Sequence, residues 1–175
     1  MTDTQTERGS PFWRFSLGFY RQSGVADACI ALQDGCGVDV NILLLFLWLA
    51  TARRCLPPAA AKALCAQAGP WRDDVVVPLR TLRRWLKDGS PLVERGAAEL
   101  FRTKIKAVEL ESERLQQEAM FALADGLATE SAPTIEAAAR ANVAAYEHAV
   151  ARTFTLAPID VLIAALSAGQ RGACR

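Results

Sequence analysis

The chain has 175 residues, of which 51% are hydrophobic and 22% are charged, and this composition excludes global disorder. Twenty basic residues balance nineteen acidic ones, so the formal net charge of +1 gives no strong nucleic-acid signal and no preference for an anionic membrane. The length suits one domain, which we expect to cover residues 10–169 between flexible tails at residues 1–9 and 170–175.

The N-terminal segment and the cysteines predict a cytoplasmic protein. The opening MTDTQTERGSPFWRF lacks the basic and then apolar pattern of a secretory signal. The longest apolar block, Ile42–Ala52, is shorter than the roughly 20 residues that a transmembrane helix needs, so we expect no membrane span. Five cysteines, an odd number without a CxxC pair, indicate reduced thiols.

Helix-start and helix-stop signals divide the first half of the chain into helices. A helix beginning at Ser10-Pro11 ends before Gly24, and a second covers residues 25–34. The next helix, Asp39–Arg54, is apolar nearly all the way round, which predicts a helix buried among others.

Two more helices follow this central helix. The first covers residues 59–68 and is closed by Gly69, and the second covers residues 71–87 with a kink at Pro78. No segment alternates between apolar and polar residues for long enough to make a strand. The predicted fold class is therefore all-α, a single-domain helical bundle with a buried central helix.

The second half of the chain predicts a long antiparallel helical hairpin from about residue 97 to 152. In the charged segment 92–127, seven positions step alternately by four and three residues, as in a coiled coil: Phe101, Ile105, Val108, Ser112, Leu115, Ala119 and Ala122. A matching series lies on the helix 134–152: Ile135, Ala139, Val143, Tyr146 and Val150. The simplest interpretation pairs the two within one chain, before a last helix at 158–168. Pairing between two chains is the alternative, so both a monomer and a homodimer stay open.

The first candidate site is the polar turn before the central helix. Asp39 is suited to be the N-cap of that helix, with Asn41 in its first turn. The functional alternative adds Gln33 and Asp34, across the Gly35-Cys36-Gly37 turn, as polar groups that line a ligand pocket.

The second candidate site is a basic stripe on the helix 71–87. Arg80, Arg83, Arg84 and Lys87 lie at i, i+3, i+4 and i+7, and Arg72 joins the edge of the stripe. Trp85 lies at the boundary with an opposite, core-facing row: Trp71, Val75, Leu79, Leu82 and Leu86. The stripe is either an anion-binding surface or a face paired with the acidic residues of the next helix: Glu99, Glu109, Glu111, Glu113 and Glu118.

No motif in the chain indicates catalysis, and we expect neither a metal nor another cofactor. The single histidine, His148, adjoins Glu147 and so does not form the Glu-x-x-His pair of a di-iron bundle. The chain has no GxSxG sequence and no glycine-rich phosphate loop. These observations favour a protein that is not an enzyme, and the alternative is an enzyme without a recognisable motif.

Four motifs resemble an uncharacterised bacterial family that is known only as a domain of unknown function: FWRFSLGFY, ALQDGCGVDVNILLLFLWLA, VVVPLRTLRRWLK and KIKAVELESERLQQ. The resemblance covers about residues 10–125 and implies one bacterial domain, but no activity, ligand or catalytic residue.

The sequence therefore predicts a non-enzymatic binding or adaptor module, whose basic stripe contacts an acidic protein or an anionic small molecule. The alternative is a small-molecule or lipid-binding protein, with or without enzymatic activity, that has a pocket beside residues 33–52.

Overall fold

The computed structural model of the protein describes residues 9–89 and 91–173, with side chains described as far as residue 169. Most of the predicted N-terminal tail, residues 1–8, and the end of the predicted C-terminal tail, residues 174 and 175, lie outside these ranges.

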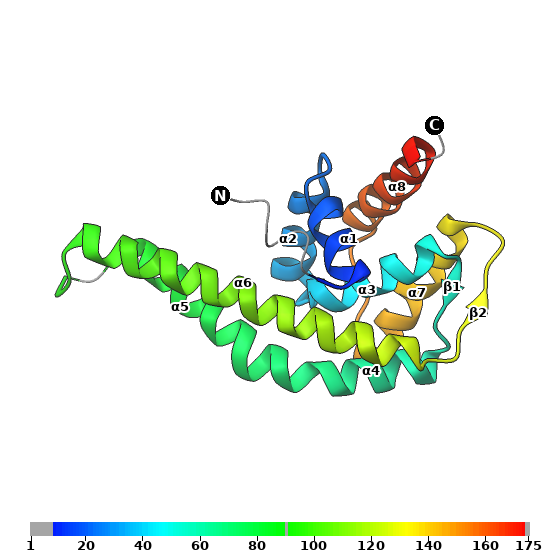
Figure 1. The fold of residues 1–175 in the computed structure, drawn as a ribbon, viewed down its shortest axis with the longest axis horizontal. Helices are drawn as coiled ribbons and strands as arrows, with labels where there is room; N and C mark the ends of the chain where they lie inside the picture. The colour runs from blue at the N-terminus through cyan, green and yellow to red at the C-terminus, as the bar shows by residue number, and fades with distance from the viewer. Residues whose placement is uncertain (1–8, 90, 174–175) are drawn as a thin grey trace.

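Helices dominate the described chain, which confirms the predicted all-α class (Figure 1). The helices are α1 (Pro11–Tyr20), α2 (Val25–Cys36), α3 (Val40–Thr51), α4 (Pro58–Trp71), the π-helical segment η1 (Arg72–Val76), α5 (Val77–Asp88), α6 (Arg95–Asp125), α7 (Ile135–Val150) and α8 (Leu156–Ala173). Two strands, β1 (Arg54–Cys55) and β2 (Glu130–Ser131), pair antiparallel and are too short to alter the class.

Helix α3 lies at the centre of the bundle, as its apolar sequence predicts. Leu43, Leu45, Phe46 and Leu47 are completely buried, because α7, α6, α1 and α8 all pack around this helix. Asp39 is the N-cap, and its carboxylate accepts hydrogen bonds from the first-turn amides. We call the bundle of α1–α4, α7 and α8 the body.

The predicted break at Gly69 is wrong, because α4, η1 and α5 form one continuous helical path (Figure 1). The π-helical segment lies between Pro70 and Pro78, and the amide of Val77 donates to the carbonyl of Arg72. A proline lacks an N–H group and crowds the preceding turn. The wider π turn accommodates both prolines without ending the helix.

The long antiparallel hairpin exists, but its predicted partner is wrong. Helix α6 packs against α5, whereas α7 packs against α3 and α4. Helix α3 is apolar on every side, so its burial requires apolar neighbours all round. Ala138, Ala139 and Val143 of α7 are buried in the same core and provide part of this contact surface. The outer part of the α5–α6 hairpin projects from the body in Figure 1, and we call it the arm.

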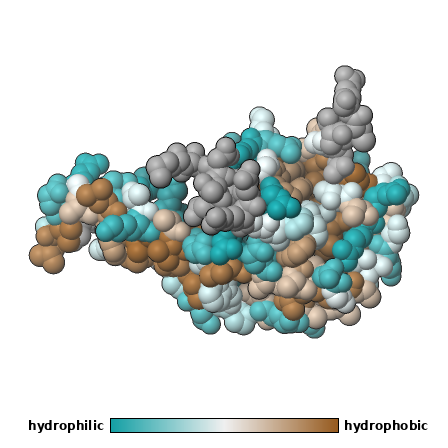
Figure 2. All heavy atoms as spheres, in the orientation of Figure 1, coloured by the Kyte–Doolittle hydropathy of each residue, from teal (hydrophilic) through white to brown (hydrophobic). Residues whose placement is uncertain are grey.

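The polarity of α5 differs in part from the prediction. Of the row expected to face a core, Leu86 is buried, but Leu82 is 37% exposed and Trp71, at the end of α4, is 40% exposed. Trp85, expected at the boundary of this row, is 57% exposed. The charged face of α5 instead contacts α6. Among the residues that the structure describes, no second layer of helices packs on the arm, so only one face of each of its helices is covered. Figure 2 accordingly shows apolar surface at the outer end of the arm and along it.

Two further predictions, on membrane-spanning helices and on the cysteines, concern the cellular compartment of the protein. In the part of the chain that the structure describes, no helix is both long and apolar enough to cross a bilayer. Cys29, Cys36, Cys55 and Cys65 are free thiols.

Candidate functional site

The inner half of the basic stripe is paired with α6. Arg80 donates to Glu109 (Nε to Oε1, 3.2 Å) and to Glu113 (Nη2 to Oε1, 2.7 Å). Arg83 donates to both oxygens of Glu109, whose side chain is buried. Burial raises the pKa of Glu113, although the neighbouring Arg80 guanidinium opposes the shift. These two arginines therefore hold the arm together and are not available to a partner.

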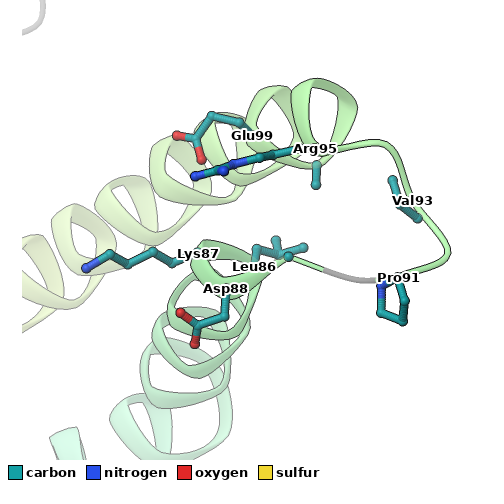
Figure 3. Close-up of a pocket in the computed structure, with 9 residues that line it drawn as sticks. Leu86, Lys87, Asp88, Pro91, Val93, Arg95 and Glu99 are labelled. Atoms are coloured by element: carbon teal, nitrogen blue, oxygen red, sulfur yellow. The ribbon is translucent and has the colours of Figure 1, made fainter.

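The outer half of the stripe is exposed. Arg84 forms a 3.0 Å ion pair with Asp34, whose oxygen also accepts from Gln33. This bond to Arg84 lowers the pKa of Asp34. Lys87 lies in a groove of about 820 Å³ at the outer end of the arm, between the end of α5 and the start of α6 (Figure 3). Trp85, two residues before Lys87, is more exposed to solvent than any other tryptophan of the described chain.

Asp39 and Asn41 belong to a buried hydrogen-bond network that joins α3 to α6. Gln116 donates to Asp39 (Nε2 to Oδ2, 2.8 Å) and accepts from Asn41 (Nδ2 to Oε1, 2.6 Å). Gln117 donates to Asn41 (Nε2 to Oδ1, 2.8 Å). Tyr146 of α7 closes the network, because its hydroxyl accepts from the Asp39 amide at 2.9 Å.

This network gives Asn41 a structural role that a helix cap alone does not require. Its amide side chain fixes the two glutamines of α6 against the start of α3. Burial raises the pKa of the Asp39 carboxyl, although Gln116 and Arg72 favour its charged form. Asp34 pairs with Arg84 and accepts from Gln33, whereas Asp39 and Asn41 bond to α6, so the four predicted polar groups do not converge.

A cleft of about 220 Å³ opens next to Asp39, and neither Asn41 nor the α6 glutamines are among the described residues that line it. The α2–α3 turn, α4, η1, α7 and the segment after α7 all contribute to it. Its residues are Cys36, Gly37, Val38, Asp39, Ile42, Cys65, Gly69, Arg72, Asp73, Tyr146, Val150, Arg152 and Phe154.

Two arginines from distant parts of the chain meet at this cleft. Arg72 donates to the carbonyl of Gly37 (Nη2 to O, 3.2 Å), and Arg152 donates to the carbonyl of Cys36 (Nη1 to O, 3.2 Å). Both carbonyls lie at the C-terminal end of α2, where cations are favoured. Arg72 also pairs with Asp73 at 2.6 Å, and its Nε lies 4.0 Å from Asp39 Oδ2.

Gly37 makes this convergence possible. Its φ of +66° is in the left-handed region, which glycine adopts without strain. A Cβ at this position would lie 2.4 Å from Nη1 of Arg152. The backbone conformation therefore favours glycine, and a side chain at this position would displace the Arg152 guanidinium from the carbonyl of Cys36.

Two ionisable side chains that line the cleft, Cys65 and Tyr146, have raised pKa values. Burial raises the pKa of the Cys65 thiol to about 12, so it stays protonated at neutral pH. Burial also raises the pKa of Tyr146. Among the described residues, no group of three or more His, Cys, Asp or Glu side chains is placed to hold a metal ion.

Sequence reasoning missed Arg152 and Tyr146 as site residues and placed Arg72 only at the edge of the stripe. Arg152 follows Ala151, whose φ of +51° ends α7 and turns the chain toward α2. Tyr146 fitted an apolar series, so its hydroxyl gave no separate signal. The adjacent pair Gln116-Gln117, at the centre of a long helix, was the available hint of a buried polar contact.

The structure thus defines an all-α domain with a buried central helix, a projecting arm and an arginine-lined cleft. The chain belongs to a family described as a protein of unknown function (DUF2390), whose model matches residues 11–120. This match confirms the predicted resemblance to an uncharacterised family. No curated protein and no solved structure matches the chain.

Proposed function

We propose that this protein binds a compact small molecule carrying one carboxylate or phosphate group in the cleft beside Asp39. The observation that carries the proposal is the meeting of Arg72 and Arg152 at one cleft. Guanidinium groups bind such anions with paired, charge-assisted hydrogen bonds. The proposal keeps the anionic ligand expected from the sequence but moves its site from the basic stripe to the cleft.

The hydrogen bonding of Arg152 supports this assignment. Within the described chain, its one side-chain hydrogen bond goes to the Cys36 carbonyl, and a guanidinium has five N–H donors. Donors therefore remain for a ligand. Ile42, Val150 and Phe154 supply apolar surface for the body of the molecule.

The size of the cleft limits the ligand. Its volume of about 220 Å³ is below the roughly 300–1,000 Å³ of drug-sized pockets. A small organic acid or phosphate ester fits this volume better than a nucleotide or a lipid. The protonated Cys65 thiol supports binding without covalent chemistry.

An NMR titration with inorganic phosphate and with butyrate tests the proposal. We expect saturable shifts of the backbone amides near Gly37 and Arg152 with at least one of these probes. Arg152→Gln removes a donor of the cleft and should weaken binding about tenfold or more. The matched control is Arg140→Gln, since Arg140 is an exposed arginine that pairs with Glu136 and Asp160 on the surface. Equal binding by the two variants, or no saturable shift with either probe, contradicts the proposal.

An adaptor that contacts an acidic partner is the second candidate function. It is supported by the exposed Trp85 beside Arg84 and Lys87, the outer half of the stripe. Titration with a glutamate-rich peptide should then change the fluorescence of Trp85, and Lys87→Glu should abolish the change. An unaltered titration with Lys87→Glu excludes this surface.

We also infer a cytoplasmic location. The free thiols support it, because disulfides are rare in a reducing compartment. Fractionation of the host cell tests this inference directly.

A further inference from the structure

One side of α6 carries an apolar row that the other described residues of the chain leave partly uncovered. Phe101, Val108 and Leu115 are 49%, 52% and 44% exposed, and Ala119 and Ala122 are exposed as well. We call these five residues the α6 seam. Residues seven apart share one face of a helix, so Phe101, Val108 and Leu115 form a continuous strip.

The series expected to cover this seam is used elsewhere. Ala139, Val143 and Tyr146 of α7 are buried in the body. Trp71, the last residue of α4, adds exposed apolar surface next to the seam, because its indole donates to the carbonyl of Ser112 at 3.0 Å. Ser112 lies one turn from both Val108 and Leu115.

Two opposite charges flank the middle of the seam. Lys104 precedes Val108 by four residues and Glu111 follows it by three, so both lie on one flank of the helix. A two-fold rotation about an axis at Val108 exchanges these positions. It places Lys104 of each copy beside Glu111 of the other, and Phe101 of each copy against Leu115 of the other.

We propose that this protein forms a homodimer in which two α6 seams pair antiparallel, with Val108 on the two-fold axis. The heptad spacing suits a second helix of the same kind. The Lys104–Glu111 arrangement makes the surface complementary to itself, as a two-fold interface requires. Lys104 and Arg114 alternate with Glu111 and Glu118 along this side of the helix, and Arg114 pairs with Glu111 within the chain. A surface of both signs suits a second copy better than an anionic lipid surface, which needs an excess of basic residues. The dimer does not depend on ligand binding in the cleft.

Charge reversal at the two flanking positions tests the proposal without altering the core. Analytical ultracentrifugation across the micromolar range should give the wild-type protein twice the 18.9 kDa mass of one chain. Lys104→Glu faces Glu111 of the partner, and Glu111→Lys faces Lys104. Each single variant should raise the dimer dissociation constant about tenfold or more. The double variant Lys104→Glu/Glu111→Lys restores opposite charges and should restore the dimer.

Lys106→Glu is the matched control, because Lys106 is an exposed lysine on the opposite side of the same helix. It should leave the dimer unchanged. A wild-type monomer throughout the concentration range overturns the proposal. So does a dimer that both single reversals leave intact, or one that the double reversal fails to restore.

Cross-linking tests the position of the axis. In a background without native cysteines, Val108→Cys should form a disulfide with its own copy. Phe101→Cys and Leu115→Cys should cross-link only when the two variants are mixed. Self-cross-linking of Phe101→Cys would indicate parallel helices and overturn the antiparallel arrangement.

Discussion

The body and the arm bury opposite kinds of side chain. In the body, α3 is surrounded by apolar residues, and its polar neighbours form one hydrogen-bonded network at its start. In the arm, arginines and glutamates lie between α5 and α6, while large apolar residues face outward. The comparison shows that an amphipathic helix does not by itself decide which face is covered. The neighbouring helix decides it.

The two regions therefore depend on different interactions. Apolar burial in the body gives a large and local gain in stability. Ion pairs in the arm offset the cost of removing charges from water, and their net contribution is small. Truncation of an apolar side chain should thus lower the free energy of unfolding most in the body. Reversal of a charge should lower it most at the contact between α5 and α6 inside the arm.

The largest difference is expected between two phenylalanines. Phe46 is completely buried in α3 and packs edge-on against Tyr146, with ring centroids 5.4 Å apart. Phe46→Ala should lower the free energy of unfolding by about 3–5 kcal/mol, because it leaves a cavity. Phe101→Ala, at an exposed position, should lower it by less than about 1 kcal/mol. Urea denaturation at a concentration where the protein is monomeric measures both, and equal costs would contradict the contrast between body and arm.

Charge reversal should separate two adjacent arginines of the stripe. Arg83→Glu places a carboxylate against the buried Glu109 and should cost about 3 kcal/mol. Arg84→Glu removes only an exposed pair with Asp34 and should cost less than about 1 kcal/mol. Thermal unfolding monitored by circular dichroism checks both variants. A small cost for Arg83→Glu would mean that the inner ion pairs do not hold the arm.

The sequence was sufficient to predict the central helix of the body. An all-round apolar segment preceded by Asp39 predicts a capped, buried helix, because no other environment suits such a surface. The start of α1 at Ser10-Pro11 was equally readable, since the serine accepts a hydrogen bond from Trp13. Both are local signals whose physical cause lies within a few residues.

The arm and the cleft could not be predicted in the same way. Both α5 and α7 have an apolar face that could pack against α6. Helix α7 instead packs on α3, whose apolar surface is buried on every side, and residue spacing does not show this. The cleft joins Arg72 to Arg152, which are far apart in the chain and belong to no motif. Such contacts arise from the packing of several helices, which residue spacing does not encode.

Asn41 tests the polar network that joins the body to α6. Asn41→Ala should cost about 2 kcal/mol, more than the loss of a helix cap, because it leaves buried atoms of Gln116 and Gln117 without partners. A double-mutant cycle with Gln117→Leu should give a coupling energy of about 1 kcal/mol. Additive costs in urea denaturation would show that the two side chains do not act together.

The smallest effect concerns Glu113, whose pKa burial raises. The folded protein therefore binds a proton at Glu113 more readily than the unfolded chain, so acidification from neutral pH stabilises the fold through this group. Glu113→Gln carries no charge at any pH and loses that dependence. The free energy of unfolding of the variant minus that of the wild type should thus be highest at pH 7 and should decrease toward pH 5, because only the wild type gains stability there. Urea denaturation of both proteins at several pH values measures the difference. A relative stability that rises on acidification would mean that the pairing with Arg80, and not burial, governs this carboxylate.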